Sequence, residues 1–96
     1  MKTLSDIKKI LRRNKPYLKK KYNINEIGIF GSYSRGDQKL RSDIDLMVDL
    51  TKPLGFEFVD LSLELEGMLN HKVDLVSKNA VKKRLYDEIK KEIIYV

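Results

Sequence analysis

The feature that most constrains this chain is a glycine-serine turn followed by a strand with acidic residues at alternate positions. The turn is Gly31-Ser32-Tyr33-Ser34-Arg35-Gly36-Asp37, and the strand begins within Ser42-Asp43-Ile44-Asp45-Leu46-Met47-Val48. The apolar run Ile27-Gly28-Ile29-Phe30 predicts an earlier strand that leads into the turn. Residues after the glycine-serine pair can begin a short helix, whose first backbone NH groups lack partners within the helix and suit an anion. The stretch is typical of a phosphate-binding turn joined to a metal-binding strand.

The two acids of this strand are expected on the same side of it. Side chains two residues apart share a face of a strand, so Asp43 and Asp45 point together. Ile44 and Leu46 point the other way, toward a core that holds the strand rigid. Carboxylates about 7 Å apart along the backbone suit Mg²⁺, which proteins hold through one or two carboxylates plus substrate phosphates. Two such ions roughly 3.5 to 4 Å apart promote in-line displacement at phosphorus.

Length and composition exclude several other kinds of site. With 96 residues the chain is expected to form one small domain, residues 1–96, with no separate substrate domain. The absence of cysteine excludes disulfides and thiolate metal sites, and the single histidine excludes a multi-histidine zinc site. The first residues contain no apolar secretory core, and no run approaches the roughly 18 to 20 apolar residues of a membrane span. We therefore expect a soluble, cytoplasmic protein with no membrane contact.

The net charge of +6 is unevenly distributed along the chain. Residues 1–22 carry nine lysines and arginines against one acid, residues 23–77 carry five against ten, and residues 78–96 carry six against three. An acidic middle between basic ends is typical of a cation site with positive flanks, and it leaves phosphate-rich partners open. The plainer interpretation is that most lysines only keep helix surfaces solvated.

Periodicity and turn residues predict alternating helices and strands. A first helix begins at a Thr3 or Ser5 cap, and we expect Asn14-Lys15-Pro16 to interrupt it, because the residue before proline disfavours helix. The later elements are expected to be a helical turn at 18–22, a strand ending at Phe30, a short helix after the glycine-serine pair, a strand at 43–50, a helix at 56–69, a strand at 72–76 and a helix at 80–92. Residues 93–96 can end as a short strand or dock as helix, and periodicity does not decide.

The strand at 72–76 supplies a third acid. Val73 and Leu75 share one face of it and Asp74 takes the other, which makes Asp74 the natural partner of Asp43 and Asp45. The element order is αβαβαβα, so the class is α/β or α+β, with a small mixed sheet covered by helices on one side. The open face of that sheet would carry the three aspartates.

These residues resemble the hallmark of the DNA polymerase beta superfamily of nucleotidyltransferases. That hallmark is Gly-Ser, a gap of about ten residues, Asp-x-Asp with apolar flanks, and a third acid on a later strand. It appears here as Gly31-Ser32, ten residues, Asp43-Ile44-Asp45, and Asp74 within Lys72-Val73-Asp74-Leu75-Val76. In so short a chain the pattern is most similar to the minimal nucleotidyltransferase (MNT) subgroup. One departure is Asn70-His71, where relatives often have Gly-Arg, and we expect His71 to be an exposed loop residue.

The resemblance implies an Mg²⁺-dependent nucleotidyltransferase that moves a nucleoside monophosphate from an NTP to a hydroxyl. Many MNT proteins are antitoxins of HEPN-family ribonuclease toxins, and some transfer AMP from ATP to a toxin tyrosine. For this chain it implies a protein adenylyltransferase, a type VII-like antitoxin in a hetero-oligomer with its toxin. Two Mg²⁺ ions would be held by Asp43 and Asp45, and Asp74 would complete the shell of the catalytic ion.

The same resemblance assigns the nucleotide phosphates to the glycine-serine turn. Gly31 and Ser32 would hold the triphosphate, while Arg35 and Ser42 belong to the same motif and are assigned to phosphate binding or to structure. A P-loop is rejected, because Asp37-Gln38 stands where that motif needs lysine and serine or threonine.

Two other functions remain open from the sequence. The first is a non-catalytic binding module that neutralises a partner by occlusion. The second is a nucleotidyltransferase acting on RNA or on a small hydroxylated molecule, since the basic first helix leaves RNA binding open, with the steep salt dependence that phosphate contacts give.

Overall fold

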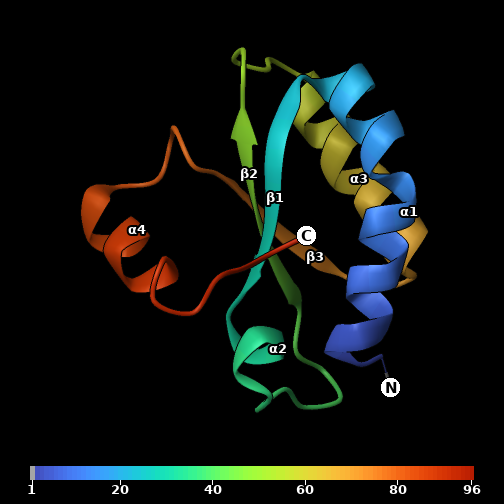
Figure 1. The fold of residues 1–96 in the computed structure, drawn as a ribbon, viewed down its shortest axis with the longest axis vertical. Coiled ribbons are helices and arrows are strands. Elements are labelled where there is room, and N and C mark those ends of the chain that lie inside the picture. The colour runs from blue at the N-terminus through green and yellow to red at the C-terminus, as the bar shows by residue number, and fades with distance from the viewer. Residues whose placement is uncertain (1) are drawn as a thin grey trace.

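The computed structural model describes residues 2–96. The elements in chain order (Figure 1) are helix α1 (Leu4–Tyr22), strand β1 (Ile24–Phe30), helix α2 (Ser32–Arg35), strand β2 (Ile44–Leu50), helix α3 (Glu57–Leu69), strand β3 (Val73–Ser77), helix α4 (Lys83–Ile89) and strand β4 (Ile94–Tyr95). Within the described residues, none of the helices has the length and apolar content needed to cross a membrane.

The four strands form one mixed sheet in the order β3-β2-β1-β4. Strand β1 is antiparallel to both of its neighbours, β2 and β4, whereas β2 and β3 are parallel. Helices α1 and α3 cover one face of the sheet, and α4 lies on the opposite side (Figure 1). The predicted mixed sheet with helices packed on one face is therefore confirmed, and α4 is the element closest to its other face.

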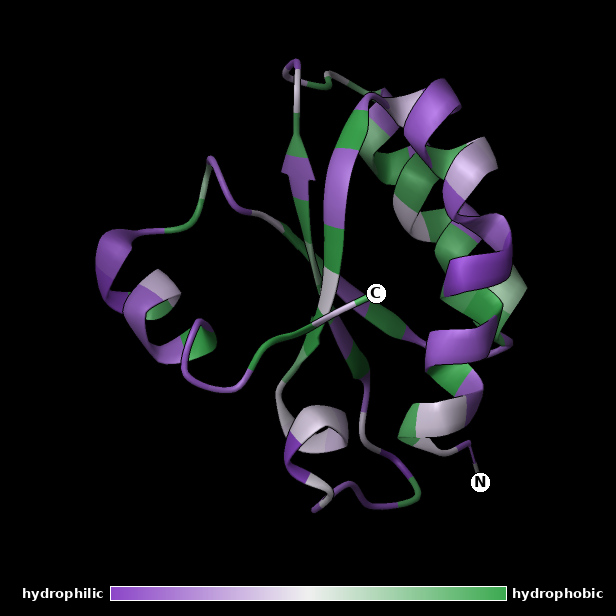
Figure 2. Ribbon diagram, viewed as in Figure 1, coloured by the Kyte–Doolittle hydropathy of each residue, from purple (hydrophilic) through white to green (hydrophobic). Residues whose placement is uncertain are grey.

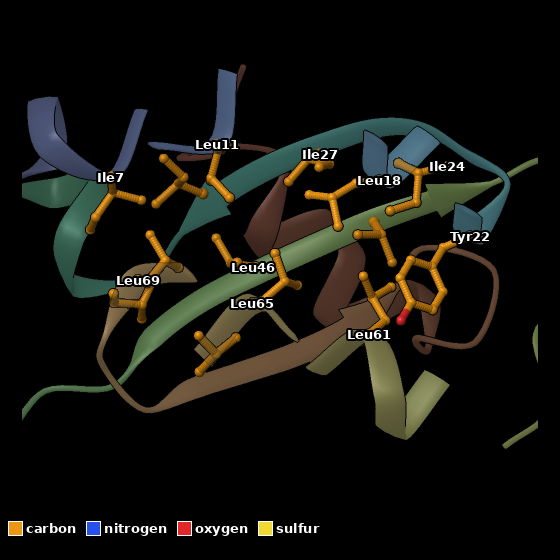
Figure 3. Close-up of a cluster of buried hydrophobic side chains, with 14 of the residues drawn as sticks. Ile7, Leu11, Leu18, Tyr22, Ile24, Ile27, Leu46, Leu61, Leu65 and Leu69 are labelled. Carbon is orange, nitrogen blue, oxygen red and sulfur yellow. The ribbon is translucent and has the colours of Figure 1, made fainter. Parts of the chain in front are cut away.

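The hydrophobic core fills the space between the sheet and helices α1 and α3 (Figure 3). On β2, Ile44, Leu46 and Val48 are fully buried in this core. Asp45 lies between them in sequence and is only partly buried, because alternate side chains of a strand face opposite sides. Each buried aliphatic side chain stabilises the fold by about 1.5–3 kcal/mol. The predicted alternation of Ile44, Asp45 and Leu46 is confirmed, and buried side chains hold the core-facing side of the strand in place.

Helix ends follow the capping residues of the sequence. Thr3 caps α1, accepting a hydrogen bond from the Asp6 backbone NH at 3.2 Å while the Asp6 carboxylate accepts one from the Thr3 NH at 3.0 Å. Helix α3 ends at Asn70, whose φ of 48° is left-handed, as predicted for a helix stop. Of the two caps considered for the first helix, the structure uses Thr3.

Helix α1 is continuous, so the predicted interruption at Asn14-Lys15-Pro16 is wrong. A proline inside a helix costs about 3 kcal/mol, since it removes one hydrogen bond and crowds the preceding turn. Leu18 and Tyr22 lie beyond the proline and are buried in the core. Their burial exceeds that cost, and Pro16 itself is exposed. The outward side of α1 is mostly hydrophilic (Figure 2).

Helix α4 is much shorter than the predicted helix at 80–92. The backbone NH groups of Ala80 and Val81 both donate to the Ser77 carbonyl, which places those residues in a turn. After Ile89, residues 90–92 turn again and the chain enters β4, which pairs with β1. Pairing with the open edge of β1 satisfies backbone groups that a longer helix would leave free. Leu85, predicted on the buried side, is consequently 48% exposed.

Candidate active site

Two of the three predicted acids are brought side by side by the strand register. Asp45 on β2 is the direct partner of Asp74 on β3, and adjacent strands lie about 4.8 Å apart. Asp43 precedes the first residue of β2, so the strand is one residue shorter than predicted at that end. Asp43 and Asp74 are exposed, whereas Asp45 is partly buried. The backbone positions of the three aspartates therefore lie at one end of the central strands.

The carboxylates of Asp43 and Asp74 are close enough to affect the pKa of Asp45. Burial raises the pKa of Asp45 from its ordinary value of 3.8 to about 6, and repulsion from Asp74 and Asp43 contributes to the rise, while Arg35 opposes it. Such a rise is typical of a partly buried carboxyl that lies near other carboxylates. Oxygen ligands of this kind suit Mg²⁺, so the chemistry of the donor set fits a divalent ion.

Within residues 2–96, however, no three acidic, histidine or cysteine side chains stand in an arrangement that would hold a single metal ion. The backbone positions of the three aspartates converge, while the exposed side chains of Asp43 and Asp74 extend into solvent. The roles of these residues as metal ligands therefore stay predictions.

Gly31 brings the glycine-serine turn against the acidic cluster. Its φ of +74° and ψ of −152° lie in a region that is essentially restricted to glycine. A Cβ atom at this position would overlap the carboxylate of Asp45. The Gly31 carbonyl accepts hydrogen bonds from the NH groups of Ser34 and Arg35, both at 3.1 Å, which closes the turn into the short helix α2. The glycine is thus required so that Asp45 and the turn share one site.

A fourth carboxylate, which sequence reasoning missed, reaches this turn from the end of the chain. The Gly31 NH donates to Oε2 of Glu92 at 2.5 Å. Nη1 of Arg35 donates to both oxygens of the same carboxylate, at 3.1 and 3.0 Å, and Nε of Arg35 donates to Asp37 at 3.1 Å. These bonds to Asp37 and Glu92 raise the pKa of Arg35. No local pattern marks Glu92, because its partner is 61 positions away.

A cavity of about 360 Å³ lies beside these groups. Its lining includes Gly31, Ser32 and Arg35 from the glycine-serine turn and helix α2, Asp45 from β2, and Glu92 from the segment before β4. A larger cavity of about 650 Å³ has mainly apolar walls, and none of the three aspartates lines it. The smaller cavity is therefore the one that combines the glycine-serine turn with one of the three aspartates, Asp45.

Ser42, also assigned to the motif, has its hydroxyl engaged within its own loop. Oγ of Ser42 accepts a hydrogen bond from the Lys39 NH at 2.9 Å, and its carbonyl lies 2.6 Å from Nε2 of His71. His71 also meets the ring of Tyr33 edge to face, with centroids 6.0 Å apart. The expectation that His71 is exposed is wrong, since these contacts leave it only partly accessible. A phosphate role for Ser42 stays a prediction.

Comparison with known proteins agrees with the geometry. The family model described as "Polymerase beta, Nucleotidyltransferase" matches residues 6–96. The protein adenylyltransferase MntA of Thermococcus cleftensis is 39% identical over 97 residues, which cover 100% of this chain and 98% of that protein. A toxin-antitoxin crystal structure with AMP-PNP is 30% identical with a TM-score of 0.73, covering 96% of this chain and 70% of that one.

A further structure contains a tri-AMPylated Shewanella oneidensis HEPN toxin in complex with an MNT antitoxin. It is 27% identical to this chain with a TM-score of 0.63, and the match covers 96% of this chain and 66% of that one. The resemblance inferred from the glycine-serine turn and the aspartates is confirmed. The chain belongs to the polymerase beta nucleotidyltransferase family.

Proposed function

We propose that this chain is an Mg²⁺-dependent minimal nucleotidyltransferase, one domain over residues 1–96, that transfers AMP from ATP to a tyrosine hydroxyl of a HEPN-family toxin. It acts as the antitoxin in the cytoplasm, where ATP is available. The observation that carries the proposal is that Asp45 is the register partner of Asp74 and also lies against the Gly31 turn, beside a cavity that both Asp45 and the turn line. The AMPylated HEPN toxin found in complex with a similar MNT antitoxin supports the acceptor.

In this proposal the three aspartates bind the metal ions of MgATP and the glycine-serine turn binds its phosphates. Asp43, Asp45 and Asp74 would hold two Mg²⁺ ions. Burial first, and repulsion from Asp74 and Asp43 second, raise the pKa of Asp45, and bound cations would relieve the repulsive part. When bound, Mg²⁺ neutralises phosphate charge and lowers the pKa of the attacking hydroxyl. The Gly31 NH, the Ser32 hydroxyl and the Arg35 guanidinium would hold the triphosphate, since all three groups line the same cavity.

The transfer is an in-line displacement at the α-phosphorus of ATP. The acceptor oxygen forms a bond to that phosphorus, and the bond from the phosphorus to the α,β-bridging oxygen breaks. Pyrophosphate leaves with the bonding electrons, and the proton of the hydroxyl passes to Asp74, which is the most exposed position of the strand pair. Asp45 lies deeper and fixes the geometry around the phosphorus.

The exposed position of the site suits a macromolecular acceptor. Asp43, Asp74 and Arg35 are all exposed, so a protein surface can approach the reacting atoms directly. In such an arrangement the acceptor would supply part of the binding surface. A hetero-oligomer with the toxin follows from this proposal.

The test is transfer of label from [α-³²P]ATP. The purified protein is incubated with Mg²⁺, labelled ATP and the product of the neighbouring gene, and the modified residue is mapped by mass spectrometry. Asp43→Asn and Asp45→Asn should abolish labelling while circular dichroism stays unchanged, and Asp49→Asn, on the same strand, should label normally. Two results together would refute catalysis: no NTP gives label on the toxin, and a variant lacking all three site aspartates still neutralises it. The protein would then neutralise the toxin by covering its surface.

A further inference from the structure

We propose that the carboxylate of Glu92 is an internal competitor for the nucleotide phosphates, held on the donors that the triphosphate needs. The inference rests on the proposed function, because it assigns the phosphate to the Gly31 turn and Arg35. Glu92 accepts a hydrogen bond from the Gly31 NH at 2.5 Å and two from Nη1 of Arg35 at 3.0 and 3.1 Å. A backbone NH and a guanidinium are the donors with which proteins bind phosphate oxygens.

The backbone that carries Glu92 is fixed in place. Gly28 of β1 lacks a side chain where Ile93 crosses it, and a Cβ atom there would overlap the Ile93 side chain. The next residue, Ile94, pairs with β1, and Ile89 on the other side of Glu92 is buried. Movement of the whole segment would break these contacts. Release of the donors therefore occurs by rotation of the Glu92 side chain, which is 25% exposed to solvent.

Charge makes the competition direct. The Glu92 carboxylate repels Asp45 and contributes to the rise in the Asp45 pKa. A triphosphate in the cavity adds negative charge next to the Glu92 carboxylate. The triphosphate and Glu92 therefore cannot both occupy the NH of Gly31 and Nη1 of Arg35. Nucleotide binding then includes the cost of displacing a partly exposed, charge-assisted contact. Removing the Glu92 charge should tighten nucleotide binding about tenfold.

The experiment is titration of the full chain with AMP-PNP and Mg²⁺ by isothermal calorimetry. Glu92→Gln keeps the shape of the side chain, and Glu92→Ala removes it. Glu88→Gln is the matched control, because Glu88 lines the same cavity and pairs with Lys91 at 3.4 Å, without contact to the turn. We expect both Glu92 variants to bind about tenfold more tightly than wild type and the control to stay within twofold. Circular dichroism checks that each variant is folded.

Equal or weaker binding by both folded Glu92 variants would overturn the inference, since Glu92 would then support the donors instead of occupying them. A tenfold gain in Glu88→Gln would overturn it as well, because the effect would be general repulsion. If the Glu92 variants bind more tightly but no label reaches any acceptor, the proposed function fails and the competition stands. If transfer occurs and affinities are unchanged, only the competition fails.

Discussion

Replacing Asp45 by asparagine is expected to make the protein more stable and inactive. Desolvation and the neighbouring carboxylates raise the pKa of Asp45 to about 6 from 3.8, so the folded state holds its proton more tightly than the unfolded state does. A shift of this size corresponds to about 3 kcal/mol, and partial solvent access reduces it to about 1–2 kcal/mol. That free energy is the destabilisation caused by an ionised Asp45, and asparagine removes it.

The sign of the effect fixes its pH dependence. Below pH 3.8 the carboxyl is protonated in both states, and ionisation costs the fold nothing. As the pH rises toward 6, the unfolded state releases its proton first, so the stability of the wild type falls. Above about pH 6 the full destabilisation is present. Asp45→Asn should therefore gain about 1–2 kcal/mol at pH 7.5 and almost nothing at pH 3.5.

Urea unfolding at the two pH values measures this difference, without metal and then with Mg²⁺. For a chain of this size, the gain at pH 7.5 corresponds to a rise in Tm of roughly 5–10 °C. Asp49→Asn is the control, because Asp49 is on the same strand but accepts a hydrogen bond from Asn25 at 3.2 Å. Mg²⁺ should stabilise the wild type and not Asp45→Asn. A variant less stable than wild type at pH 7.5, or a gain independent of pH, would refute the reasoning.

Three further predictions, on the Gly31 turn, Glu64 and Pro16, are tested by urea unfolding. Gly31→Ala should lower the free energy of unfolding by about 2–4 kcal/mol, because the added Cβ overlaps Asp45 and the backbone is strained. The control Gly36→Ala, at φ +80° with open space around it, should lower it by about 1 kcal/mol. Equal losses would contradict the overlap. Glu64→Gln should lower the free energy of unfolding by about 1 kcal/mol at pH 7, since hydrogen bonds from two tyrosine hydroxyls lower the pKa of Glu64 to about 2. This loss should disappear between pH 4.5 and pH 2, where the Glu64 carboxylate is protonated. A loss that does not depend on pH would show that it does not arise from the charge of Glu64. Pro16→Ala should stabilise helix α1 by about 1–3 kcal/mol, and a loss would show that the proline is favourable in its place.

The sheet and the acids were accessible from the sequence because they depend on local rules. Alternation in β2 requires only the two-residue period of a strand, and it separated Ile44 and Leu46 from Asp45 correctly. The same period placed Asp74 on the exposed face of β3. That the two acids are register partners depends on strand order and pairing, which periodicity does not determine.

Errors arose where long-range packing outweighed local preference. Pro16 signals a helix end, yet Leu18 and Tyr22 continue the buried stripe of Ile7 and Leu11 across it. That stripe was visible in the sequence and indicates one helix, since the four positions fall on one side at helical spacing. The end of α4 carried no such signal, because its boundary depends on the pairing of β4 with an open strand edge.

The contact between Glu92 and the Gly31 turn shows why a motif alone describes this site incompletely. The turn places the Gly31 backbone NH beside the Arg35 guanidinium, and in a partly buried cavity such donors are costly to leave without an anion. The fold supplies one from its own C-terminal segment, and Gly28 permits the close approach of Ile93 that sets Glu92 in position. On the proposed function, a nucleotide would bind to donors that already have a partner, so its net binding free energy would be the difference between the binding free energies of two anions. Nucleotide affinity would then be adjustable by changes at Glu92 that leave the aspartates untouched.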